Sequence, residues 1–359
     1  MEDLPMSDSF KVRSSIRDYE VHFIDDIVIK LKSVINSGDY IFIDENVLAM
    51  DGITELVAEY GKVIRIHANE QTKSYEGVIP FFEELIVNGF KRNNRLIAIG
   101  GGITQDITAF IASVLYRGVD WIFFPTTLLA QADSCIGSKT SINFRKFKNQ
   151  IGNFYPPLSI HISTKVLESL QERDIRSGVG EMAHYFFVSG QDDVDFFEKA
   201  YTTAIKDQSN LKEVIKASLS IKKRYIEIDE FDRKERIVFN YGHTFGHAIE
   251  SITNYDIPHG VAVSFGMDMA NFISVKKGYI TIEDFNRAHL IFNTIWKGYS
   301  IKHLSINALL KAMEKDKKNE NGKLGLILSK GWGNMFRDLT LPDQEFIGWL
   351  EEYMKSFQA

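Results

Sequence analysis

The chain has 359 residues, of which 44% are hydrophobic and 25% are charged, an ordinary globular composition that excludes the disordered and fibrous classes. A chain of this length usually divides into domains, so we expect two domains that share a cleft. The formal net charge is -6. This value excludes a global positive field that would attract nucleic acid, and any anionic ligand must be held by local groups.

Cys135 is the single cysteine, so an internal disulfide is excluded, and the chain fits a reducing compartment in which this residue has a packing role. The sequence lacks an apolar run of about 18 residues, the length that a membrane span needs. Its start, MEDLPMSDSF, lacks the basic and apolar regions of a secretion signal. We therefore expect a cytoplasmic protein that does not enter a membrane.

Short apolar runs of the kind that form buried strands alternate with segments of helical period through residue 165. The runs are Tyr40 to Ile43, Val63 to Ile66, Leu96 to Ile99, Trp121 to Phe124 and Ser159 to Ile162. This alternation predicts an α/β domain with a parallel sheet over residues 1–165. Segments such as Leu211 to Glu227 and Ile237 to Ser251 have helical period, which predicts an all-α domain over residues 166–359.

A glycine run, Gly100-Gly101-Gly102, follows the third predicted strand and precedes a helical segment, Ile107 to Leu115. Glycines there let a ligand approach the backbone, and the start of a helix offers free amides to phosphate. The run differs from the GxGxxG fingerprint, and a purely structural turn is the alternative interpretation.

Polar residues follow three other predicted strands. Asp44 and Asn46 follow the first, Glu70 and Lys73 the second, and Thr126 and Thr127 the fourth. Open parallel sheets bind ligands beyond the carboxyl ends of their strands, and acidic groups there commonly accept ribose hydroxyls. Helix caps and solvated charges are the alternative for any one of these positions.

Two histidines, His243 and His247, stand four residues apart, which places both on one face of a helix. Thr244 occupies the position where a zinc protease has glutamate, so protease chemistry is disfavoured. Arg236 and Asn240 extend the same spacing backwards, so a continuous helix would carry a stripe of four polar side chains. A stripe of this kind indicates a site, because core packing would favour apolar residues there.

A third imidazole and a carboxylate complete a candidate metal site. His259 lies in a turn-like element, Pro258-His259-Gly260, and Glu181 ends the segment Ser177 to Glu181. Two histidines and one glutamate would bind a divalent ion and leave positions open for substrate oxygens. Sequence alone leaves open whether these residues meet.

Several segments in order along the chain resemble successive blocks of the dehydroquinate synthase family of sugar-phosphate cyclases. They are GGGITQD from Gly100, RGVDWIFFPTTLLAQADSCIGSKTSIN from Arg117, KNQIGNFYPP from Lys148, RSGVGE from Arg176, NYGHTFGHAIE from Asn240 and DKKNENGK from Asp316. The resemblance implies a homodimeric enzyme with an NAD-binding first domain, a second domain that binds zinc or cobalt, and a sugar phosphate between them.

The resemblance also implies a reaction without net redox change. In this family NAD oxidises one ring carbon, the ketone acidifies the neighbouring proton, phosphate leaves, and the same NADH restores the hydroxyl. Ring opening and an intramolecular aldol reaction then close the carbocycle.

The positions that match the family's motifs give the roles that the resemblance implies for individual residues. The resemblance implies metal ligands at Glu181, His243 and His259. It implies NAD contacts at Asp44, Asn46, Glu70, Lys73, Gly101, Gly102, Asp106, Thr126, Thr127, Lys148 and Thr164. It implies substrate contacts at Asp133, Lys139, Asn149, Lys222, Arg236, Asn240, His247 and either Lys317 or Lys318, and a contact from the partner subunit to the phosphate at Arg117.

Three positions depart from the family pattern. Gln105 and Ser138 stand where the family usually has glycine, and we interpret both as neutral changes in loops. His184 replaces a lysine three residues after Glu181, so it would point at the same site from a helix. A permanent ammonium is thereby replaced by a group that titrates near neutrality, which bears on the choice of substrate.

The substrate prediction depends on Arg236 and Asn240, because a guanidinium suits the carboxylate of the shikimate-pathway substrate, a heptulosonate phosphate. Sister cyclases that form inososes or valiolone-like cyclitols from neutral sugar phosphates usually differ here, and they are the main alternative. A metal-dependent alcohol dehydrogenase is disfavoured because its chemistry has no use for Arg117, Lys139, Lys222 and His247. A catalytically inactive homologue is disfavoured because every metal and base position is filled.

Overall fold

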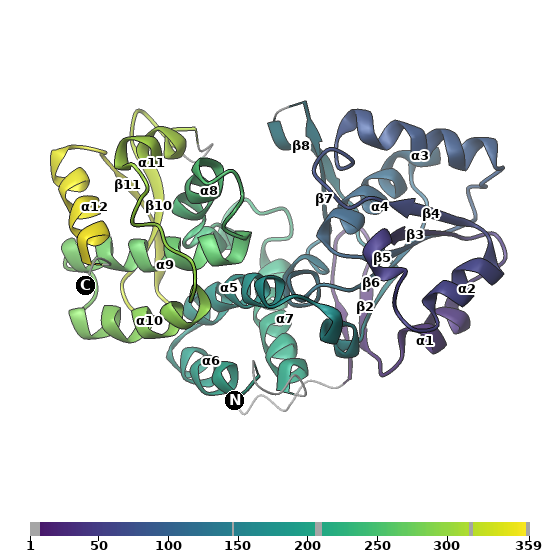
Figure 1. Ribbon diagram of the computed structural model, residues 1–359, viewed down its shortest axis with the longest axis horizontal. Coiled ribbons are helices and arrows are strands. Elements are labelled where there is room, and N and C mark those ends of the chain that lie inside the picture. Colours follow the sequence, from purple (N-terminus) through teal and green to yellow (C-terminus); the bar gives the residue numbers. More distant parts are fainter. Residues whose placement is uncertain (1–7, 146, 205–209, 316–318, 357–359) are drawn as a thin grey trace. The chain divides into compact units, whose positions relative to one another are not determined.

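The computed structural model describes residues 8–145, 147–204, 210–315 and 319–356. The chain forms two compact units, one of residues 1–170 and 211–231 and the other of residues 171–210 and 232–359 (Figure 1). The predicted boundary at residue 165 is thus wrong in one respect, because helix α7 (Leu211–Ile228) belongs to the first unit. The cause is packing, since Ser218 of α7 donates a hydrogen bond to the Ala132 carbonyl at 2.9 Å.

The first unit is built on a seven-stranded sheet with the order β1-β2-β9-β6-β5-β3-β4. The strands are β1 (Ser9–Val12), β2 (Tyr19–Phe23), β3 (Tyr40–Asp44), β4 (Val63–Ile66), β5 (Leu96–Gly100), β6 (Trp121–Pro125) and β9 (Ser159–Ile162). The pair β1–β2 is antiparallel and the other neighbours are parallel, so the predicted parallel sheet and its five strands are confirmed.

Helices cover both faces of this sheet. Figure 1 shows α3 (Tyr75–Val87) and α4 (Gly102–Val114) on one side and α1 (Ile27–Val34) and α2 (Ile53–Tyr60) on the other. Burial on both faces explains why β5 and β6 are apolar along their whole length and why β3 is apolar up to its last residue, Asp44. The remaining elements are short: η1 (Glu45–Val47), η2 (Leu115–Arg117), the π-helical turn η3 (Ala130–Ser134), the hairpin β7 (Lys139–Phe144) and β8 (Phe147–Phe154), and η4 (Thr164–Ser169).

The direction of chain progression across the sheet reverses between β3 and β5. From β3 the chain adds β4 on one side, and it then crosses to add β5 and β6 on the other. Ile43 pairs with Ile99, so Asp44 and Gly100 end neighbouring strands. A reversal of this kind opens a crevice at the carboxyl edge, where nucleotides bind in such sheets.

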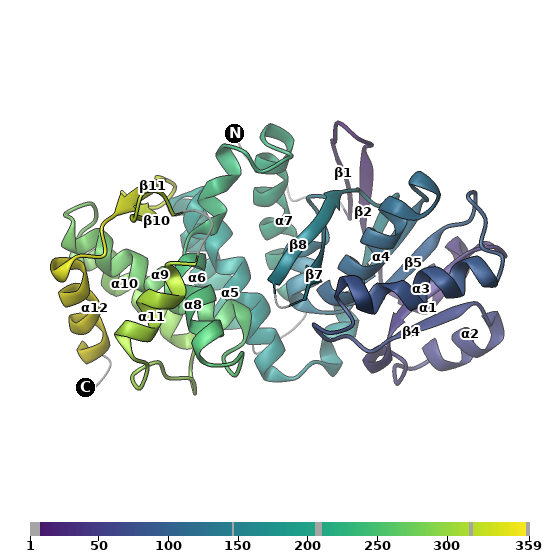
Figure 2. The same cartoon turned by 90° about the horizontal axis from the view of Figure 1, so that it is seen from above.

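The second unit is mainly helical. It contains α5 (Glu172–Ser189), α6 (Gln191–Ala204), η6 (Glu235–Asn240), α8 (His243–Ile252), α9 (His259–Lys276), α10 (Ile282–Ile295), α11 (Ile306–Met313) and α12 (Gln344–Ser356). Helix α9 is the centre, since α5, α8, α10, α12 and β10 all pack against it (Figure 2). Residues 260–274 of α9 are buried, in keeping with a helix that is apolar on all sides.

The helical second unit is as predicted, with one addition that the sequence analysis missed. The strands β10 (Leu324–Ser329) and β11 (Met335–Thr340) form an antiparallel pair, so this unit is not purely α. Strand β10 is buried throughout, and an apolar run of this length cannot be told from a helical segment by periodicity. Within the described part of the chain, every helix falls short of the length and apolar character that crossing a bilayer requires.

Candidate active site

A break between η6 and α8 sets the positions of the polar residues that precede the metal cluster. The predicted continuous helix from Ile237 to Ser251 is wrong, because Gly242 adopts a left-handed conformation with φ 79°. A Cβ atom on Gly242 would lie 2.6 Å from the Val263 carbonyl oxygen of α9, so this close approach requires glycine. Arg236 and Asn240 therefore lie on a 3₁₀ turn, apart from the α8 face that carries the histidines, and the predicted four-residue stripe does not form.

Backbone contact between α5 and α9 brings the carboxylate and one histidine together. A Cβ atom on Gly180 would lie 2.0 Å from the Gly260 carbonyl oxygen, and one on Gly260 would lie 1.8 Å from the Ser177 carbonyl oxygen. The next residue after Gly180 is Glu181, and the residue before Gly260 is His259. The latter begins α9, which corrects the prediction of a turn at Pro258-His259-Gly260.

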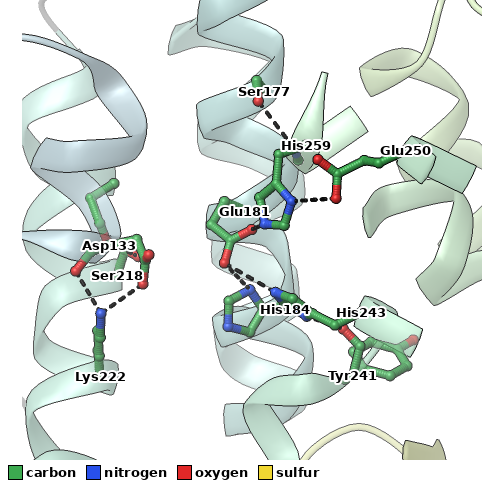
Figure 3. Close-up of polar contacts among 12 residues, drawn as sticks. Asp133, Ser177, Glu181, His184, Ser218, Lys222, Tyr241, His243, Glu250 and His259 are labelled. Carbon is green, nitrogen blue, oxygen red and sulfur yellow. Dashed lines mark hydrogen bonds and ion pairs between the residues drawn. The ribbon is translucent and has the colours of Figure 1, made fainter. Parts of the chain in front are cut away.

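The three predicted metal ligands converge in the second unit (Figure 3). Glu181 Oε1 lies 3.4 Å from His243 Nε2, and Glu181 Oε2 lies 3.3 Å from His259 Nε2. One ligand atom from each residue lies within 4.8 Å of the others. Two imidazole nitrogens and a buried carboxylate at these separations suit a divalent cation with positions left for oxygen ligands.

Both histidines are oriented by a second partner at Nδ1. His243 Nδ1 lies 3.2 Å from the Tyr241 carbonyl oxygen, and His259 Nδ1 lies 2.9 Å from Glu250 Oε2. When Nδ1–H donates to these acceptors, Nε2 is left as the lone-pair nitrogen that faces Glu181. Glu250 was not predicted from the sequence, although its position seven residues after His243 on one helix face was a usable signal.

Charge coupling is strong in this cluster when no cation neutralises it. Burial raises the pKa of Glu181, but His243 and His259 outweigh burial and hold the pKa well below its ordinary value. Burial lowers the pKa of His259, but the carboxylates of Glu250 and Glu181 raise it well above its ordinary value. A cation would replace the proton that His259 otherwise carries.

Two other predicted residues line the cluster. His184 is fully buried on α5, with Nδ1 3.7 Å from Glu181 Oε1 and its ring centroid 5.3 Å from that of His243. His247 is exposed, with its ring centroid 5.5 Å from that of His243 and 5.7 Å from that of His259. The structure thus brings both side chains to the candidate metal site.

The remaining predicted residues of the second unit lie near this cluster in sequence. Arg236 is buried on η6, and the Asn240 side chain donates to the Ile237 carbonyl at 3.0 Å. The predicted contact at Lys317 or Lys318 lies outside the described residues.

In the first unit, several predicted nucleotide contacts lie at the carboxyl edge of the sheet. Asp44 accepts hydrogen bonds from the backbone and the side chain of Asn46, both at 3.0 Å. Helix α4 begins at Gly102, and among the described residues no side chain caps its first turn. Its free amides therefore point to the edge where a phosphate would bind. Thr126 and Thr127 follow β6, and Thr164 follows β9.

A second group of predicted nucleotide contacts is joined by ion pairs. Lys73 Nζ lies 2.6 Å from Asp106 Oδ2, and Lys148 Nζ lies 3.0 Å from Glu70 Oε1. Asn143, which the sequence analysis missed, donates to Glu70 Oε2 at 2.7 Å. These contacts join the loop after β4 and the start of α4 to the β7–β8 hairpin.

The predicted substrate contacts of the first unit lie on several elements. Lys222 Nζ of α7 lies 2.7 Å from Asp133 Oδ1 of the π-helical turn (Figure 3). Lys139 begins β7 and is exposed, and Asn149 on β8 has a left-handed conformation with φ 52°. Arg117 is exposed on η2 and forms no ion pair with any residue that the structure describes.

The two residues of this unit that depart from the family pattern lie in different structural environments. Ser138 is buried with a left-handed φ of 62°, as expected at a position where glycine would be less strained. Gln105 lies in the first turn of α4, which corrects its interpretation as a loop residue.

Comparisons with known proteins agree over most of the chain. The family described as 3-dehydroquinate synthase N-terminal matches residues 63–177, and the family described as 3-dehydroquinate synthase C-terminal matches residues 178–319. The 3-dehydroquinate synthase of Dictyoglomus turgidum is 39% identical over 293 residues, covering 81% of this chain and 82% of the relative. That of Streptococcus pyogenes serotype M3 (strain ATCC BAA-595 / MGAS315) is 31% identical over 360 residues, covering 97% and 100%.

Solved structures show the same fold. A 2-deoxy-scyllo-inosose synthase, complexed with carbaglucose-6-phosphate, NAD+ and Co2+, matches with a TM-score of 0.84 and 24% sequence identity. The match covers 97% of this chain and 99% of that one. At this identity the likeness establishes the fold alone.

Proposed function

Because the chain belongs to the 3-dehydroquinate synthase family, we propose that it catalyses the phosphate-eliminating cyclisation of a heptulosonate phosphate to 3-dehydroquinate. The reaction makes the enzyme a carbon–oxygen lyase. The observation that carries the proposal is the cluster of Glu181, His243 and His259, because it joins the ligand set of a catalytic divalent ion to the matched family. When bound, NAD supplies a reversible hydride acceptor and zinc or cobalt supplies a Lewis acid.

We assign the cation to Glu181, His243 and His259. The fit is supported by the short separations of their ligand atoms and by the Nδ1 partners that direct both Nε2 atoms to one place. His184 and His247 border this position. We assign them to hydrogen bonding with substrate hydroxyl and phosphate oxygens.

We assign NAD to the first unit. The fit is supported by the uncapped amides at the start of α4, which suit a pyrophosphate, and by Gly101 and Gly102, which let it approach. Asp44 at the neighbouring strand end is suited to ribose hydroxyls. The other contacts in this assignment are Asn46, Glu70, Lys73, Asp106, Thr126, Thr127, Lys148 and Thr164.

The sugar phosphate would be held by charges of fixed position. Arg236 offers a planar fork for a carboxylate, while Lys222, Lys139 and His247 neutralise the departing phosphate. Asp133 holds Lys222 in place, since the two are paired at 2.7 Å. We assign further hydrogen bonds to substrate to Asn149, Asn240 and either Lys317 or Lys318.

We further propose a cytoplasmic homodimer in which Arg117 of one subunit reaches the phosphate bound by the other. Support comes from Val114 and Tyr116, which expose 45% and 37% of their surface beside the exposed Arg117. An apolar surface beside Arg117 is compatible with an interface, and the resemblance to a homodimeric family is the main support for the dimer.

The decisive experiment supplies the protein with NAD, zinc or cobalt, and a panel of acidic and neutral sugar phosphates. Free phosphate and the product structure are measured by colorimetry and NMR. Phosphate should appear from the heptulosonate phosphate without lasting NADH absorbance. Stoichiometric NADH would replace this proposal with an alcohol dehydrogenase, and turnover of neutral substrates alone would replace it with a cyclitol-forming sister enzyme.

A further inference from the structure

The π-helical turn Ala130–Ser134 carries Asp133, which is joined twice to one lysine. Lys222 Nζ contacts both the Asp133 carboxylate at 2.7 Å and the Asp133 carbonyl oxygen at 2.6 Å. Both acceptor atoms belong to this π-helical turn. π-helical turns are rare and are frequently found at functional sites.

Gln105, in the first turn of α4, closes a ring of two hydrogen bonds with the residue next to Asp133. The Gln105 side-chain Nε2 donates to the Ser134 carbonyl oxygen at 2.6 Å, and Ser134 Oγ donates to Gln105 Oε1 at 2.6 Å. Gln105 is 5% exposed, so water does not readily replace these bonds. A glycine, the residue that the family resemblance predicts here, could make neither bond.

Three further hydrogen bonds hold the rest of the turn. Ser218 Oγ donates to the Ala132 carbonyl oxygen at 2.9 Å, and the Gln131 side chain donates to the carbonyl oxygens of Pro125 and Ser163 at 3.0 and 2.8 Å. At the Ser134 end, the two hydrogen bonds of Gln105 add to the backbone bond from the Cys135 N–H to the Ala130 carbonyl oxygen at 3.0 Å. Loss of Gln105 would therefore loosen the end that carries Asp133.

We propose that Gln105 is a positioning residue that fixes the Asp133–Lys222 pair through Ser134. Gln105 lies three residues after Gly102, in the helix that starts at the proposed nucleotide-binding edge of the sheet. Its side chain joins this helix to the π-helical turn that binds Lys222. The inference that Gln105 fixes the position of this pair depends only on these contacts. Its consequence for turnover rests on the proposed function, in which Asp133 and Lys222 contact the substrate.

The test uses Gln105→Met, which keeps the length of the side chain and removes both hydrogen bonds, and Ser134→Ala, which removes one. Thr108→Val is the matched control, because it removes another buried hydrogen bond of α4 that ends within the helix, at the Thr104 carbonyl. Lys222 accessibility is measured on the folded protein as its rate of acylation by a water-soluble succinimidyl ester, read by peptide mass spectrometry. Lys216 of the same helix serves as the internal reference.

Gln105→Met should raise the acylation rate of Lys222 relative to Lys216 at least about fivefold, with a smaller rise in Ser134→Ala and none in Thr108→Val. With the heptulosonate phosphate, kcat/KM should fall about tenfold, the size expected for one or two lost net hydrogen bonds, while the dissociation constant of NAD stays within about twofold. The double variant should lose little more than Gln105→Met, because both changes remove the same ring.

An unchanged acylation rate of Lys222 in both Gln105→Met and Ser134→Ala would overturn the proposal. A fall in kcat/KM that Thr108→Val reproduces would also overturn it. If acylation rises as expected but the wild-type protein releases phosphate from no sugar phosphate, the positioning role stands and the proposed function fails. Should Gln105→Met not fold, the comparison of Ser134→Ala with Thr108→Val decides.

Discussion

Glu250 Oε2 lies 2.9 Å from His259 Nδ1, and the opposite nitrogen of the same ring faces Glu181 at 3.3 Å. A carboxylate in this position selects the tautomer that presents Nε2, and it makes that nitrogen more basic. Glu250 is therefore placed to control the orientation and basicity of His259, a proposed metal ligand.

The first prediction concerns this pair. Glu250→Gln should weaken binding of zinc or cobalt by about 10- to 100-fold, the usual cost of losing an outer partner of a ligating histidine. Metal affinity is measured by competition with a chromophoric chelator, and circular dichroism checks the fold. Glu351→Gln on the exposed side of α12 is the matched control and should leave affinity unchanged. Equal affinities in the two variants would contradict the role of Glu250.

The second prediction concerns the ligand set. His259→Ala and His243→Ala should each lose stoichiometric metal after dialysis, because two ligands rarely hold a catalytic divalent ion. Chelation of the wild type should abolish phosphate release, and added zinc or cobalt should restore it. His303→Ala, at an exposed histidine of the same unit, should keep full metal content. Full metal content and turnover in His259→Ala would refute the site.

The third prediction concerns the substrate carboxylate. Removing one partner of a desolvated charged pair typically costs about 2 to 5 kcal/mol, so Arg236→Met should lower kcat/KM for the heptulosonate phosphate roughly thirtyfold or more. A neutral heptulose phosphate, if turned over, should be barely affected. Arg287→Met is the control, since Arg287 forms a half-exposed ion pair with Glu198. Equal losses on both substrates would indicate that Arg236 does not recognise a carboxylate.

The fourth prediction concerns pH and a histidine inside the first sheet. Burial, with smaller electrostatic contributions from Lys30 and His22, lowers the pKa of His161 to about 3. The unfolded chain binds a proton at this residue below about pH 6.5 while the folded chain does not, so stability falls as pH drops.

Between pH 7 and pH 5 this residue alone should reduce the free energy of unfolding by about 2 kcal/mol. His161→Phe should remove that part of the pH dependence, and His67→Gln, at an exposed histidine, should not. Urea unfolding at both pH values measures the difference. Identical pH dependence in wild type and His161→Phe would mean that His161 is protonated in the folded protein.

Much of the fold follows from sequence because the decisive signals are local. The strands β5 and β6 are apolar throughout, β3 is apolar up to Asp44, and the glycine run ends at the first residue of α4. The break at Gly242 was missed because its cause is the backbone of α9, more than 15 residues further along the chain. The spacing of Arg236, Asn240 and His243 fits one helix. The residue pattern thus keeps a helical period even where the backbone breaks the helix.

The sequence predicted which residues could be metal ligands, but it did not predict that these residues lie close together. Glu181 and His259 are 78 residues apart, and nothing in their own segments states which helices touch. The role of Gln105 was missed for the same reason, since it contacts a partner from another element. Long-range packing decides such pairs.

The glycines at 180 and 260 give a criterion for recognising this centre in other chains. Any side chain at either position would collide with the facing backbone, so α5 and α9 would have to separate, and Glu181 and His259 would move apart with them. A sequence that keeps the glutamate and both histidines but has a larger residue at either glycine would thus contain the ligand residues without the geometry of the site. Searches for relatives that share this chemistry should therefore require the small residues beside the ligands as strictly as the ligands themselves.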